Sequence, residues 1–354
     1  MKPLIAVAVL GTFAGACAAQ SSVTVFGIMD LAVRHVKNGS VGSITSEVSG
    51  GTASSRWGLR GSEDLGGGLK ASFWLESDIA ADTGAGNATS FFNRRSTVSL
   101  SSDAAGELRL GRDLIPTHVA SCAIDPFGCV GMAAATNYRA TQAAVFSGMG
   151  GVQVAFRANN GVSYLTPAKL GGFLAQVTVS AGEGQLSAGT EQAKSTALRL
   201  GYVSGPINIQ AATRKVENAT AAISDFKDNV IGASYNFGVA TVGLQRRSFE
   251  FGADKLAISM AHISVPIGAG VLRATYQRAD QKSPNATTNA NDSSLIGIGY
   301  QHYLSKRTSL YGTATRISND NRAIFTVAGG PAVTAANFGG QKSTAYEIGL
   351  RHDF

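Results

Sequence analysis

Residues 69–78 read Leu-Lys-Ala-Ser-Phe-Trp-Leu-Glu-Ser-Asp. Up to residue 75 the odd-numbered positions carry Leu, Ala, Phe and Leu, whereas the even-numbered positions carry Lys, Ser, Glu and Asp around the single Trp74. Successive side chains of a β-strand point to opposite faces, so this alternation predicts a strand with one apolar and one polar face.

The same alternation recurs along the chain. It is found at residues 23–34, 56–60, 198–202, 207–214, 272–277 and 346–354. Gly contributes 43 of 354 residues and only 15% are charged, which argues against long helices and against disorder. A hydrophobic fraction of 44% is low for an α-helical membrane protein. The sequence therefore predicts an all-β chain.

The N-terminus has the pattern of a secretory signal peptide. Lys2 precedes an uncharged stretch over residues 4–19 that ends in small residues, so we expect cleavage between Ala19 and Gln20. This stretch is short for a membrane-spanning helix, and none is predicted downstream. A lipoprotein site at Cys17 is the alternative, which Ala14 weakens because Leu or Val is usual there.

The connections between the strands indicate the architecture. We count about 16 candidate strands of roughly 9 to 11 residues, the length of a tilted membrane-spanning strand. Short connections lie at residues 66–68, 101–106, 167–172, 204–206, 236–238, 266–270 and 304–307. Longer ones alternate with them at residues 37–53, 81–92, 112–158, 184–194, 216–227, 281–292 and 319–343, with a shorter one near Glu250.

Sorting of short turns to one side and long loops to the other is typical of an outer-membrane barrel, whereas a soluble β-sandwich has no reason for it. In a bilayer every backbone N–H and C=O must be paired, and strands achieve this only in a closed barrel. Residues 20–354 are therefore predicted to form a 16-stranded antiparallel transmembrane β-barrel around a water-filled lumen.

Several blocks resemble one family. They are residues 20–27, 55–71, 93–95, 110–112, 125–128, 159–164 and 349–354, and the block Ser-Arg-Trp-Gly-Leu-Arg-Gly-Ser-Glu-Asp-Leu-Gly-Gly-Gly-Leu-Lys-Ala at residues 55–71 is the most specific. Together they resemble the Gram-negative trimeric general porins of β-proteobacteria, of the Neisseria, Bordetella, Burkholderia and Comamonas type.

The resemblance implies a homotrimer in the outer membrane, among its lipid and lipopolysaccharide. It also implies that loop 3, at about residues 112–158, folds into each barrel as a constriction. Phe354 would be the signal read by the outer-membrane assembly machinery.

Two cysteines remain after export. In an oxidising compartment Cys122 and Cys129 can form a disulfide across a loop that contains Pro126 and Gly128. Two free thiols are the simpler alternative. A metal site is less favoured, because His118 is the only nearby imidazole and Zn²⁺ usually takes four ligands.

Charge on the polar faces predicts the selectivity of the lumen. The odd or even position of a residue in its predicted strand, which we call its parity, indicates the face that it occupies. On this basis more basic than acidic side chains face inward, and rings of basic side chains favour anions. The resemblance points to Arg56, Arg157 and either Arg94 or Arg95; parity favours Arg95, and the family position favours Arg94. The full set of predicted pore-lining residues is Arg34, Arg56, Arg60, Arg94, Arg95, Arg157 and Asp125.

These patterns predict a passive channel for small hydrophilic solutes and ions that favours anions. A substrate-specific channel for phosphate or organic acids is the main alternative. Catalysis is not expected, because the five histidines are scattered and none lies in a recognisable catalytic motif. No cofactor or metal is predicted, and a net charge of +7 without a basic cluster does not indicate nucleic-acid binding.

Overall fold

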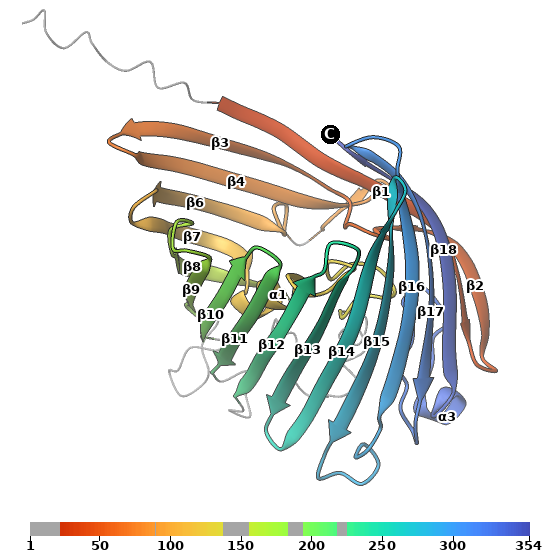
Figure 1. The fold of residues 1–354 in the computed structure, drawn as a ribbon. Coiled ribbons are helices and arrows are strands. Elements are labelled where there is room, and N and C mark those ends of the chain that lie inside the picture. The colour runs from red at the N-terminus through yellow and green to blue at the C-terminus, as the bar shows by residue number, and fades with distance from the viewer. Residues whose placement is uncertain (1–21, 89, 137–155, 183–193, 218–224) are drawn as a thin grey trace, which may run out of the picture.

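A computed structural model describes residues 22–88, 90–136, 156–182, 194–217 and 225–354. These residues form one sheet that curves round to meet itself (Figure 1). All neighbouring strands pair in antiparallel fashion.

The strands are, in chain order, β1 (Ser22–Asn38), β2 (Gly42–Ser49), β3 (Arg56–Gly66), β4 (Leu69–Ala80), β5 (Ala85–Gly86), β6 (Arg95–Ser102), β7 (Gly106–Leu114), β8 (Arg157–Leu165), β9 (Phe173–Ser180), β10 (Ser195–Ser204), β11 (Ile207–Val216), β12 (Phe226–Asn236), β13 (Thr241–Phe251), β14 (Asp254–Ile267), β15 (Gly270–Lys282), β16 (Ser293–Tyr303), β17 (Thr308–Asn319) and β18 (Lys342–Asp353). The helices are α1 (Pro116–Cys122) and α3 (Ala335–Phe338).

The sheet closes where β1 meets β18. β1 pairs with β18 along one edge and with both β2 and β3 along the other, so β2 and β3 form one interrupted barrel strand. β5 is a two-residue ladder on β4 outside the main ring. The described residues therefore form a closed barrel of 16 strands, which confirms the predicted fold class.

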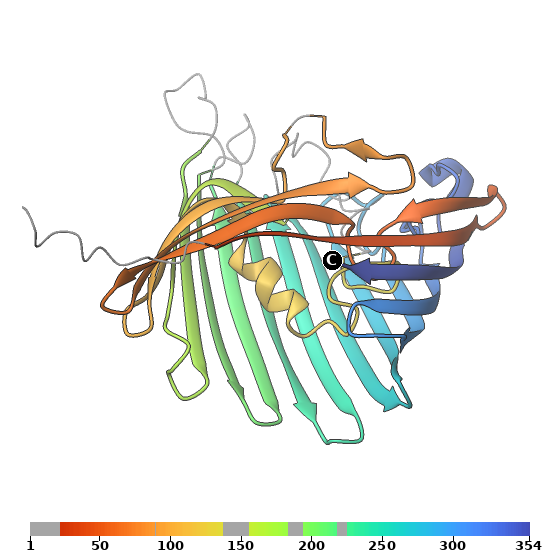
Figure 2. The same ribbon diagram turned by 90° about the horizontal axis from the view of Figure 1, so that it is seen from above.

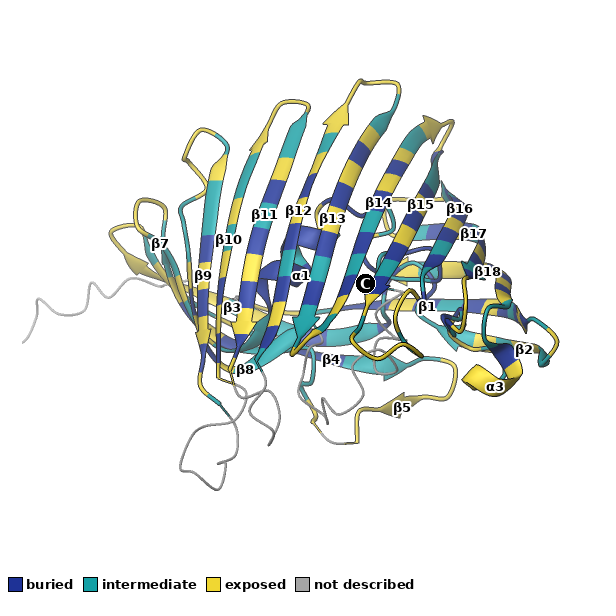
Figure 3. Cartoon of the chain, turned by 90° about the horizontal axis from the view of Figure 1, so that it is seen from below, coloured by how far each residue is buried: buried dark blue, intermediate teal, exposed yellow. Residues whose placement is uncertain are grey.

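Burial in the barrel is the reverse of that in a soluble protein. Polar side chains such as Asp30 and Asp228 are fully buried, whereas Leu244 and Ile348 are 67% and 70% exposed. The two classes alternate along the strands, as the banding in Figure 3 shows. A barrel with an apolar outer surface and a polar interior is suited to a bilayer. We call the face that carries the buried polar side chains the inner face.

The connections are sorted by side, with two differences from the predicted pattern. Residues 37–49 form the end of β1, a tight turn at residues 39–41 and β2 rather than a long loop, and residues 50–55 then leave the ladder. The connection between β7 and β8 spans residues 115–156 instead of 112–158, because both strands extend further than predicted. We call the two ends of the barrel the short-turn end and the long-loop end.

Part of the connection between β7 and β8 contacts the inner face. The helix α1 packs against β9, β10, β11 and β12 (Figure 2). The hydroxyl of Thr117 donates to Asp228 on β12 at 2.6 Å, and Gln277 on β15 donates to the carbonyl of Ala133 at 3.0 Å. Residues 137–155 of the predicted loop 3 lie outside the described residues.

A second connection also covers the inner face near the long-loop end. Ala323, Phe325 and Val327 are almost fully buried against apolar side chains that point inward from the strands. The backbone of Phe325 and Val327 pairs with the side chains of Asn319 and Ser343. This apolar cluster differs from the predicted pattern, because alternation assigns only polar side chains to the inner face.

No helix in the described part of the chain has the length and hydropathy to cross a bilayer. The predicted signal peptide at residues 1–19 lies outside the described residues.

Candidate functional site

Three arginines gather near one carboxylate on the inner face. The Nε atom of Arg94 lies 2.5 Å from Oε1 of Glu76 on β4, and the Nε atom of Arg56 on β3 lies 3.7 Å from the same oxygen. Trp74 donates its indole N–H to the other carboxylate oxygen of Glu76 at 3.2 Å. Glu76 is therefore held by three side chains and partly neutralises two guanidinium groups.

Arg157 joins this cluster through the backbone. It begins β8, and its Nε donates to the carbonyl of Arg94. Arg112 on β7 donates to the neighbouring carbonyl of Asn93 at 2.7 Å. Two cationic side chains therefore hold the short segment that places Arg94 beside Glu76.

The cluster has an excess of positive charge. Arg56 and Arg94 share Glu76, and in the part of the chain that the structure describes Arg157 makes no ion pair with a carboxylate. We call Arg56, Arg94 and Arg157 the guanidinium cluster. Such a group attracts anions and repels cations that pass within a few ångströms.

Arg95 and Arg60 lie on the same inner face. Arg95, the first residue of β6, packs its guanidinium over the ring of Trp74 at 4.6 Å and lies 3.6 Å from Asp113. Arg60 packs over Trp74 and Phe26, at 5.2 Å from each ring centre. Arg60 and Arg95 line a cavity of about 220 Å³. Arg94 and Arg95 therefore both point to the inner face, although they are neighbours in the sequence. Arg94 precedes β6, so the alternation of faces along the strand does not apply to it.

Arg34 is on the inner face but apart from this cluster. It is 7% exposed, lies 2.6 Å from Glu347 on β18 and donates to the carbonyl of Ala328. Its charge is thus paired and covered by the connection between β17 and β18.

Asp125 organises the segment that follows α1. Its carboxylate accepts backbone N–H groups from Phe127, Cys129 and Ala135, at 2.9, 3.1 and 2.8 Å. Burial raises the pKa of Asp125 above its usual range, and these three donors act in the opposite direction. The structure places this residue as a support for the loop backbone, at 6% exposure.

Cys122 and Cys129 are joined by a disulfide, with Cα atoms 5.1 Å apart. His118 lies beside them, with its Nε2 atom 3.4 Å from Sγ of Cys122. These three side chains are close enough to one another to share an ion in the absence of the disulfide. The disulfide occupies both sulfur ligands, so the arrangement favours a structural cross-link.

Asp30 lies on the inner face, as its place in the alternation predicts, and has a supporting role that the sequence pattern does not indicate. It is fully buried, and its carboxylate accepts the backbone N–H groups of Gly51, Thr52 and Ala53 at 2.8 to 3.0 Å. Tyr311 on β17 also donates to it. These bonds hold residues 50–55 against the inner face.

Residues 50–55 also meet the segment after α1. Gly131 has a φ of +89°, and a Cβ atom there would collide with the carbonyl oxygen of Gly51. The two segments therefore approach each other backbone to backbone. The sequence carries one signal for this role, because Asp30 is the only acidic residue within residues 22–38.

Phe354 lies at the seam of the barrel. Its backbone exchanges two hydrogen bonds of 3.0 Å with Gly27 on β1. Its ring covers Gly27, since a Cβ atom on that glycine would collide with the ring.

Comparisons with known proteins place this arrangement in context. Residues 6–322 match the family described as Gram-negative porin. Outer membrane porin protein 32 of Delftia acidovorans is 38% identical over 366 residues, with 100% of this chain and 99% of the relative covered. An outer membrane porin protein of Bordetella pertussis is 30% identical over 418 residues, with both chains covered in full. The solved structure of an anion-selective porin from Comamonas acidovorans has a TM-score of 0.83 and 36% identity, and the match covers 94% of this chain and 100% of that chain.

Proposed function

Because this chain belongs to the Gram-negative porin family, we propose that its guanidinium cluster is the charge filter of a general diffusion channel. The protein is an outer-membrane porin, through which small hydrophilic solutes diffuse passively with a preference for anions. The observation that carries the assignment of the filter is that Arg56, Arg94 and Arg157 gather around a single carboxylate, that of Glu76.

The narrow part of the channel is formed by connections on the inner face. Residues 115–136 form the constriction loop, and residues 50–55 face them. This assignment is supported by the bonds of Thr117 and Ala133 to inner-face side chains and by the close approach of Gly51 and Gly131. The disulfide between Cys122 and Cys129 restricts the conformations of the loop.

The remaining assignments follow from the family. Three copies of the chain assemble as a homotrimer, surrounded by outer-membrane lipid and lipopolysaccharide. Residues 1–19 are removed as a signal peptide, and Phe354, directly after β18, is read by the assembly machinery. The family consists of channels, and the protein carries out no covalent chemistry.

A substrate-specific channel for phosphate or organic acids is the second candidate, because the filter is cationic. Swelling of porin-containing liposomes in isotonic neutral sugars separates the two. A general channel admits the sugars at rates that fall with their size, whereas a specific anion channel excludes them. Exclusion of the smallest neutral sugars would contradict the general function.

A further inference from the structure

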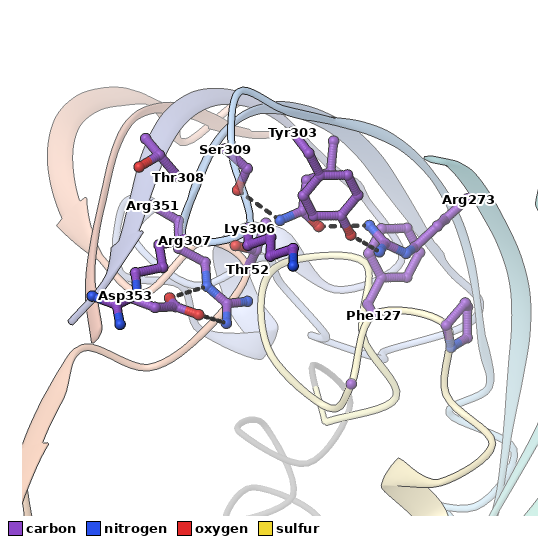
Figure 4. A pocket seen from close by; sticks show the side chains of 13 residues that line it. Thr52, Phe127, Arg273, Tyr303, Lys306, Arg307, Thr308, Ser309, Arg351 and Asp353 are labelled. Carbon is purple, nitrogen blue, oxygen red and sulfur yellow. Dashed lines mark hydrogen bonds and ion pairs between the residues drawn. The ribbon is translucent and has the colours of Figure 1, made fainter. Parts of the chain in front are cut away.

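A cavity of about 320 Å³ lies on the inner face near the short-turn end. No residue of the guanidinium cluster lines it, although Arg56 is close enough to feel the charges of Arg351 and Asp353. It is bounded by inward side chains of β15 to β18, by the connection between β16 and β17, and by Phe127 and Thr52 from the two inward-lying segments (Figure 4). Its volume is at the lower end of the range of small-molecule sites.

The cavity is strongly cationic. Arg273, Lys306, Arg307 and Arg351 line it, with Asp353 as its single acidic residue. Asp353 is occupied by Arg351, which binds it through two nitrogen–oxygen contacts of 2.8 Å. One anionic group is thus already neutralised by one cation.

The other three cations have no such partner. Among the described residues, Arg273, Lys306 and Arg307 form no ion pair with a carboxylate. The guanidinium of Arg273 instead donates to neutral oxygens, those of Gln301 at 3.0 Å and Tyr303 at 3.4 Å. Arg273 also feels the charge of Asp125, but that carboxylate is already bound by backbone N–H groups.

Neutral donors complete the lining. The hydroxyl group of Ser309 lies in the lining and accepts from Gln301 at 2.8 Å, whereas the hydroxyl group of Thr308 pairs with His352 at 2.9 Å. The guanidinium group of Arg273 comes from β15, the charges of Lys306 and Arg307 come from the connection between β16 and β17, and the hydroxyl group of Ser309 comes from β17. This donor set suits a tetrahedral oxyanion, since Arg and Lys form charge-assisted hydrogen bonds with such groups.

We propose that this cavity is a second anion site of the channel, which binds a small doubly charged oxyanion at the short-turn end of the lumen. The inference rests on the proposed diffusion channel, because the anion reaches the site through the lumen. An anion that has passed the guanidinium cluster meets three cations without carboxylate partners before it leaves.

Inorganic phosphate at pH 8 is the probe. The complete porin is reconstituted in planar bilayers, and the chloride current is measured as phosphate is added on the side of the short turns. The test variant is Lys306→Gln with Arg307→Gln. The matched control is Lys70→Gln with Lys169→Gln, which removes two charges near the same end but outside the cavity. Arg273→Gln is a second test variant within a strand.

Phosphate should reduce the chloride current of the natural protein in a saturable manner. In the test variant the half-blocking concentration should rise about tenfold, which is the effect of losing two partly exposed cationic contacts. The control should keep the natural value. Equal block in the test variant and the control, or a current in the natural protein that phosphate does not reduce, would overturn the inference.

The two proposals fail separately. A natural protein that conducts and favours anions but is not blocked by phosphate would contradict only the second site. A natural protein that does not favour chloride over potassium would contradict the proposed filter, whatever phosphate does.

Discussion

The Nε atom of Arg94 lies 2.5 Å from Oε1 of Glu76, on the inner face of a barrel whose outer surface is apolar. This ion pair leaves Arg56 with a shared partner and Arg157 with a backbone carbonyl. The local balance of charge on this part of the inner face is therefore positive. In the proposed charge filter, the ion selectivity of the channel follows from this imbalance.

Replacing Arg56 and Arg157 by Gln should weaken the preference for anions. A unit charge about 7 Å from the path of an ion changes its energy by about 0.6 kcal/mol at the dielectric constant of water, which is about threefold in permeability. Because the charge acts with opposite sign on chloride and on potassium, we expect the chloride-to-potassium permeability ratio to fall by about sevenfold for each charge removed. Reversal potentials in a KCl gradient measure this ratio. Lys169→Gln serves as the control, because its side chain is 81% exposed on a short connection.

Replacing Glu76 by Gln should have the opposite effect on selectivity. Arg56 and Arg94 lose their shared carboxylate, so the permeability ratio should rise by about sevenfold. The barrel should also become less stable by about 1 to 3 kcal/mol, since a half-buried guanidinium is left without its partner. A thermal unfolding curve in detergent, recorded with the reversal potential, checks both effects. An unchanged ratio would contradict the assignment of the filter.

Replacing Cys122 and Cys129 by Ser should loosen the segment after α1. A cross-link that closes so small a loop contributes roughly 2 to 3 kcal/mol through the restricted unfolded chain. The bonds of Asp125 to Phe127, Cys129 and Ala135 remain, so we expect a mobile loop in a folded barrel. Faster cleavage by added protease and greater noise in the open-channel current are the expected results. The natural protein treated with reductant should behave in the same way.

Replacing Gly27 by Val should disturb the closure of the barrel. A Cβ atom at this position would collide with the ring of Phe354 and with the carbonyl oxygen of Arg56, at a cost of about 1 to 3 kcal/mol. Gly86→Val is the matched control, because a Cβ atom there meets only open space. The shift in gel mobility between folded and heat-denatured porin reports the fraction of closed barrels. Equal fractions in both variants would show that packing of Phe354 on Gly27 does not matter.

Alternation of residue types was sufficient to predict the fold. Period-two patterns at Leu69–Leu75 and Tyr346–Phe354 mark strands with an outward apolar face, and the lengths of the connections mark the two ends of the barrel. These signals are local, so they can be read without knowing which strands pair. The same method failed at residues 37–53, where the Gly and Ser residues predict a loop although residues 37–38 lie in β1 and residues 42–49 form β2.

The sequence predicted which residues belong to the candidate site, but not which of their side chains form ion pairs and hydrogen bonds with one another. Parity could place Arg56 and Glu76 on one face, but it could not resolve Arg94 from Arg95, since regular strand geometry begins between them. The burial of Arg34 against Glu347 depends on a contact over 313 positions of the chain, which no local pattern reveals. The same holds for the bond of Asp30 to Tyr311.

The sign of the reversal potential tests the central claim most directly. Porin trimers in a planar bilayer would be placed between KCl solutions of roughly tenfold different concentration, across which chloride and potassium diffuse at rates set by the charge of the lumen. We predict that the more dilute side becomes negative at zero current, because chloride crosses faster than potassium through a lumen with an excess of guanidinium groups. A dilute side that becomes positive, or a potential of zero, would contradict the assignment of Arg56, Arg94 and Arg157 as an anion filter.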